Sequence, residues 1–383
     1  MGYTFMVPAK IISGTGVIED LGEHIQGKGT KALIVTDAFM VKFGNAAKVE
    51  AALKKVNIPY VVFDGANTEP TDKIVASGLS VYQQEGCDFL IALGGGSPMD
   101  TAKAIAFMSV VKGKISDYMH TVIDMPVPYL VAIPTTAGTG SEVTKNTIIS
   151  DTAHNVKMLL GGPSIIPALA VVDPTFTMTA PPSVTAATGI DALCHAIEAY
   201  TSRKAQPLTD TFALSAIKKI HKNLPICYRD GKNVDARLGM SIAALEAGIA
   251  FNNASVTIVH GMSRPIGALF HIAHGVSNAV LLPACMEFAI EENTDRFATI
   301  GRIMGVADEN TSDPAAAEAM VREVSRFCQE VGIPTLEKLG VKKEDFFAQL
   351  SKMADDALES GSPQNTMRIP TKEQIMEIYR KLF

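Results

Sequence analysis

The sequence predicts an α/β domain with a parallel sheet, followed by an all-helical domain. Over the first half of the chain, short apolar runs alternate with helical stretches, and two of these runs end in glycine- and hydroxyl-rich loops. Such alternation favours parallel strands joined by helices. Apolar residues at helical spacing dominate the second half. Pro181 and Pro182 separate the two patterns, so we expect the domains at residues 1–182 and 183–383.

The elements follow from these patterns in chain order. The runs expected as strands of one parallel sheet lie at residues 31–37, 60–65, 88–96, 128–136, 147–151 and 168–174. The stretches expected as helices lie at 51–58, 74–86 and 97–111 in the first domain, and at 235–254, 313–332 and 371–383 in the second.

Composition excludes several function classes. The chain has 383 residues, of which 47% are hydrophobic and 19% charged, and its net charge of −6 has no long runs of one sign. This argues against a nucleic-acid partner and favours a small ligand. Five cysteines without a CxxC pair are typical of reduced thiols. With no signal-peptide pattern and no run of eighteen apolar residues, we expect a soluble, cytoplasmic protein with no membrane partner.

The segment DFLIALGGGSPMDTAKA places three glycines between an apolar strand and a helix. Ser97 suits the N-cap position and Pro98 the first helical position, so free N–H groups at this helix start would face an anion. A second loop, PTTAGTGS from Pro134 to Ser141, offers hydroxyl groups to phosphate or ribose. Two such loops at strand ends predict a nucleotide-binding crevice.

The motif is not the usual GxGxxG fingerprint, and its candidate acidic residue, Asp37, precedes the glycines. Asp37 is either a turn residue or the acceptor for the adenosine ribose hydroxyls. In the second interpretation its charge repels a 2′-phosphate, which predicts NAD in preference to NADP.

A metal site is indicated by residue spacing. Asp191 and His195 are four apart in TAATGIDALCHAIEAY, so on a helix they share a face. His260 and His274 follow, with a proline and a glycine between them that we expect to break the helix, so that each ligand arrives from a separate element. Any single histidine is more often structural than a ligand, but together the four residues favour a site of three imidazoles and one carboxylate.

Four motifs in order, GGGSPMDTAKA, PTTAGTGSEVT, GIDALCHAIEAY and NNASVTIVHGMSRPIGALFHIAHG, resemble the iron-containing (group III) alcohol dehydrogenase family. The resemblance covers nearly the whole chain. It implies a dinucleotide-binding, Rossmann-like α/β domain followed by an all-helical metal-binding domain, in the dehydroquinate synthase-like fold. It also implies homo-oligomers, commonly dimers, and an NAD-dependent enzyme that interconverts small primary alcohols or diols and aldehydes.

Residue by residue, the resemblance assigns the metal ligands to Asp191, His195, His260 and His274. The cofactor positions that it implies are Asp37, Gly95, Gly96, Ser97, Pro98, Met99, Thr135, Thr136, Thr139 and Lys157. The substrate positions that it implies, in a pocket between the domains, are Asn146 and Phe251; ordinary packing is the alternative for both. Fe²⁺ is the metal implied, although the donor set would also accept Zn²⁺ or Ni²⁺.

The sequence departs from the family pattern in two places. Arg264 stands where many members carry a second histidine, four residues after the third ligand, and Glu69 stands where asparagine is common. In the implied mechanism the metal, which has His274 among its ligands, activates the alcohol for hydride transfer to NAD. A guanidinium cannot relay protons as imidazole does. We therefore expect water and the cofactor ribose to carry the proton, assisted by His271, while Arg264 supplies positive charge.

Two alternatives remain open at this stage. A dehydroquinate-synthase-like lyase would share the architecture, but its phosphorylated, carboxylated substrate requires more basic residues than Arg264 alone. A non-catalytic metal- and nucleotide-binding protein would use the same ligands to fasten the helical domain. The sequence does not separate this alternative from a catalytic site.

Overall fold

The computed structural model describes residues 2–154 and 156–383. The chain divides into two compact units, an α/β unit of Met6–Ala180 and a helical unit of Pro181–Phe383 that also includes residues 2–5. The expected domain boundary at 182/183 lies two residues after the observed one at 180/181. The sequence also offered no reason to assign residues 2–5 to the helical unit. That segment belongs there because the Gln206 side-chain amide donates to the Thr4 carbonyl at 3.1 Å.

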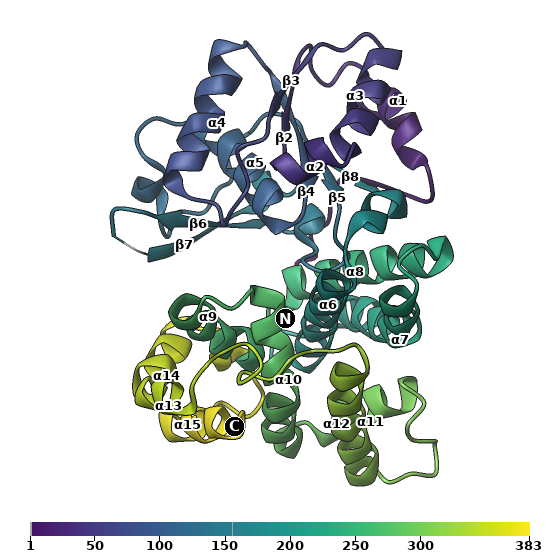
Figure 1. Ribbon diagram of the computed structural model, residues 1–383, viewed down its shortest axis with the longest axis vertical. Coiled ribbons are helices and arrows are strands. Elements are labelled where there is room, and N and C mark those ends of the chain that lie inside the picture. Colours follow the sequence, from purple (N-terminus) through teal and green to yellow (C-terminus); the bar gives the residue numbers. More distant parts are fainter. Residues whose placement is uncertain (1, 155) are drawn as a thin grey trace. The chain divides into compact units, whose positions relative to one another are not determined.

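A six-stranded parallel sheet forms the centre of the α/β unit (Figure 1). Its order is β1-β8-β5-β4-β2-β3, and every neighbouring pair is parallel. The strands are β1 (Lys10–Ser13), β2 (Ala32–Val35), β3 (Tyr60–Phe63), β4 (Phe89–Gly94), β5 (Leu130–Pro134) and β8 (Leu169–Val172). The central strands β2, β4, β5 and β8 are completely buried, which explains why they are continuous apolar runs.

Helices cover both faces of this sheet (Figure 1). Alternate residues of each strand point to opposite faces, so Leu90 packs on the side of α4 and α5, whereas Ile91 packs on the side of α1 and α3. The helices of this unit are α1 (Leu21–Ile25), α2 (Ala38–Lys42), α3 (Asn45–Lys55), α4 (Asp72–Gln84) and α5 (Gly96–Met108). The arrangement brings the ends of β2, β4 and β5 to one edge of the sheet.

The expectation that residues 147–151 continue the parallel sheet is wrong. They belong to β6 (Asn146–Asp151), which pairs with β7 (Val156–Gly161) in a separate antiparallel hairpin. Antiparallel strands need only a short connection, whereas a parallel pair needs a long crossover. In β6 buried residues alternate with half-buried or exposed ones, so only one face of the hairpin is covered.

The helical unit is built around α6 (Pro182–Thr201), which packs against α7, α8 and α10. Pro182 is the first residue of α6, where the missing N–H does no harm. The remaining helices are α7 (Pro207–Arg229), α8 (Val234–Ala254), α9 (Ile258–Phe270), α10 (His274–Ala289), α11 (Thr294–Ile303), α12 (Asp313–Glu330), α13 (Lys343–Ala348), α14 (Leu350–Glu359) and α15 (Lys372–Arg380).

Within the described residues, no single helix has the length and apolar composition needed to cross a membrane. Helices α8 and α9, which are bent at 103° to each other, together reach that length and apolar composition.

Candidate metal centre and nucleotide loops

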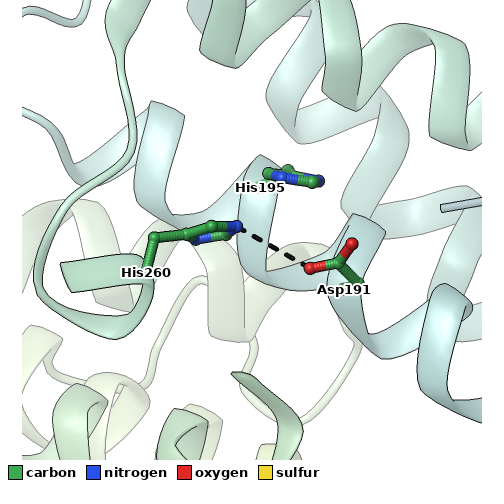
Figure 2. Close-up of side chains that lie close together, drawn as sticks. All are labelled: Asp191, His195 and His260. Atoms are coloured by element: carbon green, nitrogen blue, oxygen red, sulfur yellow. Dashed lines mark ion pairs between the residues drawn. The ribbon is translucent and has the colours of Figure 1, made fainter. Parts of the chain in front are cut away.

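Helices α6 and α9 bring three of the predicted ligands together in the helical unit (Figure 2). The ligand atoms of Asp191, His195 and His260 all lie within 4.8 Å of one another, and all three side chains are buried. His260 Nε2 is 3.7 Å from Asp191 Oδ1. The i, i+4 spacing on α6 therefore places Asp191 and His195 on one face, as predicted, and α9 supplies the third group.

The fourth predicted ligand, His274, begins α10 and reaches the same carboxylate. Its Nε2 is also 3.7 Å from Asp191 Oδ1, and its ring centroid is 5.3 Å from that of His260. The His274 side chain is 52% exposed, in contrast to the other three. The cluster thus has three deeply buried donors and one donor that solvent reaches.

The expectation that Pro265 and Gly267 break the helix between the last two histidines is wrong. Helix α9 runs through both residues to Phe270, and the break follows at His271, which has φ 54° in the left-handed region. An internal proline removes one backbone hydrogen bond and bends a helix without always ending it. His260 and His274 still arrive from separate helices, because the chain turns at residues 271–273.

Burial and charge suit this cluster to a divalent cation. Burial lowers the pKa of His195 to about 4, so its imidazole is neutral at pH 7 and available as a ligand. Burial alone would raise the pKa of Asp191, but His195, the other two imidazoles and the Asn278 amide together hold it below its usual value. His195 Nδ1 is buried without a hydrogen-bond partner in the described structure. An ionised carboxylate, a neutral imidazole at His195 and an unpartnered nitrogen fit a metal ion.

Sequence reasoning missed Glu198, which lies one turn beyond His195 on α6 and is completely buried. Its Oε2 accepts a short hydrogen bond from His260 Nδ1. Its Oε1 accepts hydrogen bonds from the Thr257 backbone at 3.1 Å, the Thr257 hydroxyl at 2.8 Å and the Val259 backbone at 2.7 Å. Glu198 therefore fixes both the start of α9 and the His260 tautomer that leaves Nε2 for the cluster. Its i+3 spacing from His195 was the available signal.

Asn278, one turn after His274 on α10, is a second missed residue. Its amide nitrogen lies 2.6 Å from Asp191 Oδ1, 3.1 Å from His260 Nε2 and 3.2 Å from His274 Nε2. Its Oδ1 is buried and has no partner in the described structure. Asn278 donates to the candidate ligand carboxylate and orients it, and the i+4 spacing from His274 was the signal that could have identified it.

The neighbours of the cluster include the predicted substrate residue Phe251 on α8. Its ring stacks on His195, with centroids 4.1 Å apart and planes at 17°. Arg264 lies one turn after His260 on α9 and is partly buried; burial lowers the pKa of its guanidinium, and Glu198 opposes that change. His271 is exposed at the end of α9. The structure thus places Phe251 against a candidate ligand and leaves His271 at the surface of its unit.

The two predicted nucleotide loops meet at one edge of the sheet. A Cβ atom added to Gly95 would lie 3.4 Å from Thr136 Oγ1, and one added to Gly96 would lie 3.4 Å from Thr139 Cγ2. At these distances a Cβ atom would be in ordinary van der Waals contact, so the two loops lie against each other. Gly94 has φ +154°, and a Cβ atom there would lie 2.4 Å from the Pro98 ring.

The predicted N-cap is wrong, because α5 begins at Gly96 with Gly95 as its N-cap. Ser97 therefore lies inside the first turn, and Pro98 and Met99 are buried behind it. The reason is that the Asp100 carboxylate accepts hydrogen bonds from Ser141 and Ile148 instead of the helix start. The glycine backbone itself then presents the free N–H groups of this helix end.

The remaining predicted cofactor and substrate residues surround these loops or lie on the hairpin. Asp37 caps α2, and its Oδ1 accepts from the Phe39 and Met40 backbones at 2.9 and 3.0 Å. Lys157 on β7 forms an ion pair with Glu69. Asn146 begins β6, and its carbonyl accepts from Lys103 at 3.0 Å. Both interpretations of Asp37 thus stay compatible with the structure, because the cap uses one of its two oxygens.

Two models of one protein family match this chain, one over each half of its length. The profile described as iron-containing alcohol dehydrogenase matches residues 8–174, and the profile of the Fe-containing alcohol dehydrogenase family, C-terminal, matches residues 185–383. The chain belongs to the iron-containing alcohol dehydrogenase family. It is thus an oxidoreductase that interconverts alcohols and aldehydes, and the predicted family is confirmed.

Individual relatives of this iron-containing alcohol dehydrogenase align over almost its full length. A NAD-dependent methanol dehydrogenase of Bacillus methanolicus is 38% identical and covers 98% of both chains. A 1,3-propanediol dehydrogenase of Citrobacter freundii is 38% identical over 100% of this chain and 99% of its own. The crystal structure of a 1,3-propanediol oxidoreductase superposes with a TM-score of 0.97 at 37% identity and covers all of both chains. The predicted fold class is confirmed.

Proposed function

We propose that the enzyme interconverts small primary alcohols or diols and the matching aldehydes, with NAD as the hydride carrier and a divalent metal at the α6–α9 cluster. The observation that carries the proposal is the convergence of the buried Asp191, His195 and His260, whose ligand atoms lie within 4.8 Å of one another. Relatives named for methanol and 1,3-propanediol support a small substrate. No dense basic cluster joins Arg264 in the described metal-site segments, which disfavours a phosphorylated sugar acid.

We assign the metal to Asp191, His195, His260 and His274. When bound, a divalent ion supplies Lewis acidity that lowers the pKa of an alcohol and promotes hydride release. Fe²⁺ is the family metal, and the donor set of three imidazoles and one carboxylate also accepts Zn²⁺ or Ni²⁺. Glu198 accepts a hydrogen bond from His260 Nδ1 and thus keeps Nε2 directed at the cluster.

The apolar wall of the substrate site belongs, in this proposal, to Phe251. Its ring covers one face of the His195 imidazole, so water is excluded from that side and a small alkyl group can pack there. Asn146 is the proposed polar neighbour of the alcohol from the α/β unit. Arg264 supplies positive charge, while water, the cofactor ribose and His271 carry the proton outward.

For the cofactor, we propose that the backbone N–H groups at Gly95, Gly96 and Ser97 receive the dinucleotide pyrophosphate. Pro98 and Met99 shape the first turn behind them. The hydroxyl groups proposed to bind phosphate or ribose are those of Thr135, Thr136 and Thr139. Asp37 has one carboxylate oxygen outside its cap, which would accept ribose hydroxyls and disfavour NADP. Lys157 would meet a phosphate or ribose hydroxyl if it leaves its pair with Glu69.

A homodimer or higher homo-oligomer in the cytoplasm completes the proposal. All five cysteines are buried and unpaired, which supports a reducing compartment. Light scattering of the purified protein coupled to size-exclusion chromatography would give the oligomeric state directly; a monomer at micromolar concentration would refute the dimer.

A substrate panel tests the reaction. The metal-depleted enzyme is reconstituted with Fe²⁺, Zn²⁺, Ni²⁺ or buffer alone, and NADH formation is followed with methanol, ethanol, 1-propanol and 1,3-propanediol, with the aldehydes assayed in reverse. We expect turnover that requires the metal and NAD. Absence of metal-dependent turnover on every alcohol and aldehyde would overturn the proposal.

A further inference from the structure

The link between α8 and α9 carries backbone strain. It consists of residues 255–257 and turns the chain, so that the two helices are bent at 103° to each other. Its first residue, Ser255, has φ 72° and ψ 160°, a combination that is essentially restricted to glycine because a Cβ atom crowds the backbone there. A residue with a side chain keeps such a conformation only where the surrounding contacts impose it. The contacts of Ser255 therefore show what holds the link in place.

The Asn365 side chain supplies those contacts. Asn365 is buried and ends the 3-10 helix η7 (Pro363–Asn365), 110 residues after Ser255 in the sequence. Its amide donates to Ser255 Oγ at 3.0 Å and to the Val256 carbonyl at 3.1 Å, so both N–H bonds of the amide hold the link. A glycine at residue 255 would relieve the strain but would offer Asn365 no side-chain acceptor.

Asn365 is itself held in place by backbone contacts. Its carbonyl accepts from the Arg203 backbone at 2.8 Å, and the next residue, Thr366, forms an isolated β-bridge with Ser202. The Ser202 hydroxyl in turn donates at 2.7 Å to the carbonyl of Ala254, the last residue of α8. The end of α8 is thus bonded both to η7 and to the chain that follows α6.

The α9 side of the link has a separate anchor. The Glu198 carboxylate accepts from the Thr257 backbone at 3.1 Å and from the Thr257 hydroxyl at 2.8 Å. A Cβ atom added to Gly261 would lie 2.6 Å from the Pro363 ring, so η7 packs closely on α9. Glu198 therefore holds the α9 side of the link, and Asn365 holds its α8 side from an element that lies against α9.

Three stacked rings connect the end of α8 to the start of α9. The Phe251 and His195 ring centroids are 4.1 Å apart, and those of His195 and His260 are 4.5 Å apart. The Ser255 N–H donates to the Phe251 carbonyl at 2.7 Å, which bonds the strained residue to the last turn of α8. Because the two outer rings belong to different helices, the bend at the link sets how closely they enclose the His195 imidazole.

We propose that Asn365 is a positioning residue for the apolar wall of the substrate site. By holding the strained Ser255, it fixes the end of α8 so that the Phe251 ring lies against His195. Without the Asn365 amide, residue 255 relaxes toward an ordinary backbone conformation and the Phe251 ring moves away. An alkyl chain that packs on this ring then loses a contact, whereas methanol, with a single carbon, loses little. This role of Asn365 rests on the proposed alcohol substrates and on Phe251 as their apolar wall.

The test compares Asn365→Leu with the wild type in the full-length, metal-loaded enzyme, because leucine has a similar volume but donates no hydrogen bond. We expect the KM for 1-propanol to rise about tenfold, with the KM for methanol changed less than about threefold and kcat and metal content within about twofold. Asn223→Leu is the control, since the Asn223 amide also donates to a backbone carbonyl of the helical unit, that of Lys219 at 2.8 Å. The ratio of the two KM values should not change in this control.

Variants at residue 255 separate the effect of strain from that of ordinary packing. Ser255→Ala and Ser255→Gly both remove the side-chain acceptor for Asn365, but only alanine keeps the Cβ atom that strains the backbone. We therefore expect the KM for 1-propanol to rise more in Ser255→Ala than in Ser255→Gly. Adding Ser255→Gly to Asn365→Leu should lower that KM again by several-fold, because glycine adopts the required conformation unaided. A purely structural role for Asn365 predicts no such rescue.

A crystal structure of metal-free Asn365→Leu provides a readout that does not depend on activity. We expect the Phe251 ring to leave its 4.1 Å stacking on His195, while His260 stays bonded to Glu198. If Asn365→Leu does not fold by circular dichroism, the crystal structure and KM values of Ser255→Ala, compared with those of Ser255→Gly, take its place.

The outcomes separate the positioning role from the proposed function. A wild-type enzyme without metal-dependent turnover on any alcohol would overturn the proposed function, and the role of Asn365 in substrate binding with it. An active wild type with an unchanged KM ratio in folded Asn365→Leu, or in Ser255→Ala if the first variant is unfolded, would overturn the positioning role alone. Equal KM values for 1-propanol in Ser255→Ala and Ser255→Gly would overturn the part assigned to backbone strain.

Discussion

The two units each contain a buried polar cluster. The clusters differ in whether their charges and hydrogen-bonding groups are balanced within the chain. In the α/β unit, each N–H of the Lys103 ammonium has an acceptor, and Asp100 lies on the same helix to balance it. In the helical unit, Asp191 faces three imidazoles, and the Asn278 amide nitrogen lies within hydrogen-bond distance of Asp191 Oδ1, His260 Nε2 and His274 Nε2. The first cluster is complete within the chain, whereas the second has a surplus of acceptors that a cation would satisfy.

The α/β cluster therefore builds the fold, whereas the groups of the helical cluster are arranged for a ligand. A charge-balanced network can fix loop geometry in the free protein. A cluster of ligands without a cation contributes little until the ion binds, after which binding stabilises the folded state. Substitutions in the two clusters should therefore affect different measured quantities.

The largest effect is expected for His274→Ala, which removes the one candidate ligand that solvent reaches. We expect turnover to fall on the order of a thousandfold, because activation of the alcohol is lost, while NADH binding stays intact. The measurements are kcat and the fluorescence Kd on the same preparation. His221→Ala is the control, since His221 bonds to Glu323 elsewhere in the helical unit. Global unfolding of His274→Ala would instead favour a structural metal that fastens the helices.

Next in size is Glu198→Gln, which keeps the volume of the side chain but weakens the acceptor for His260 Nδ1. We expect metal affinity to fall about tenfold to a hundredfold, because the His260 tautomer is no longer fixed. Competition with a chelator of known affinity measures the metal Kd. Glu246→Gln is a matched control, as Glu246 pairs with Lys219 away from the cluster. An unchanged metal Kd in Glu198→Gln would show that the hydrogen bond to His260 Nδ1 does not contribute to metal affinity.

The sequence could predict the ligands of the metal cluster but not the residues that orient those ligands. Asp191 and His195 follow from helical spacing alone, whereas His260 and His274 were expected from separate elements on the residue pattern between them, and the family resemblance then assigned the same four residues. Glu198 and Asn278 obey the same i+3 and i+4 rule, yet only the folded chain shows that their side chains reach the ligands. Spacing identifies a shared helix face, and long-range packing decides which residues on that face meet.

In the α/β unit the prediction failed where distant residues competed for a local role. Ser97 has the right chemistry for an N-cap, but the carboxylate of Asp100, three residues later, accepts hydrogen bonds from Ser141 and Ile148 and not from the helix start. Both partners lie more than forty residues further along the sequence. The same contacts align β6 beside α5, so the strand at 146–151 leaves the parallel sheet for a hairpin. No local pattern contains that information.

A smaller effect is expected for Asp37→Ser, which tests the cofactor side of the comparison. Serine retains the N-cap of α2, so the change removes charge and leaves the helix start in place. We expect kcat/KM for NADP relative to NAD to rise about tenfold, because a carboxylate no longer repels the 2′-phosphate. Asp20→Ser removes an exposed charge elsewhere in the unit and should leave the ratio unchanged. A constant ratio in Asp37→Ser would leave Asp37 as a capping residue only.

The smallest and sharpest effect concerns the proton path beside the metal cluster, where Arg264 replaces an imidazole. If the exposed His271 passes the proton outward, His271→Ala should lower kcat for alcohol oxidation by a few-fold and change the shape of the pH–rate profile. Arg264→His should partly restore the lost rate in the double variant, because it returns an imidazole one turn after His260. Identical profiles for wild type and His271→Ala would remove His271 from the relay, and the proton would then leave through water and the cofactor ribose alone.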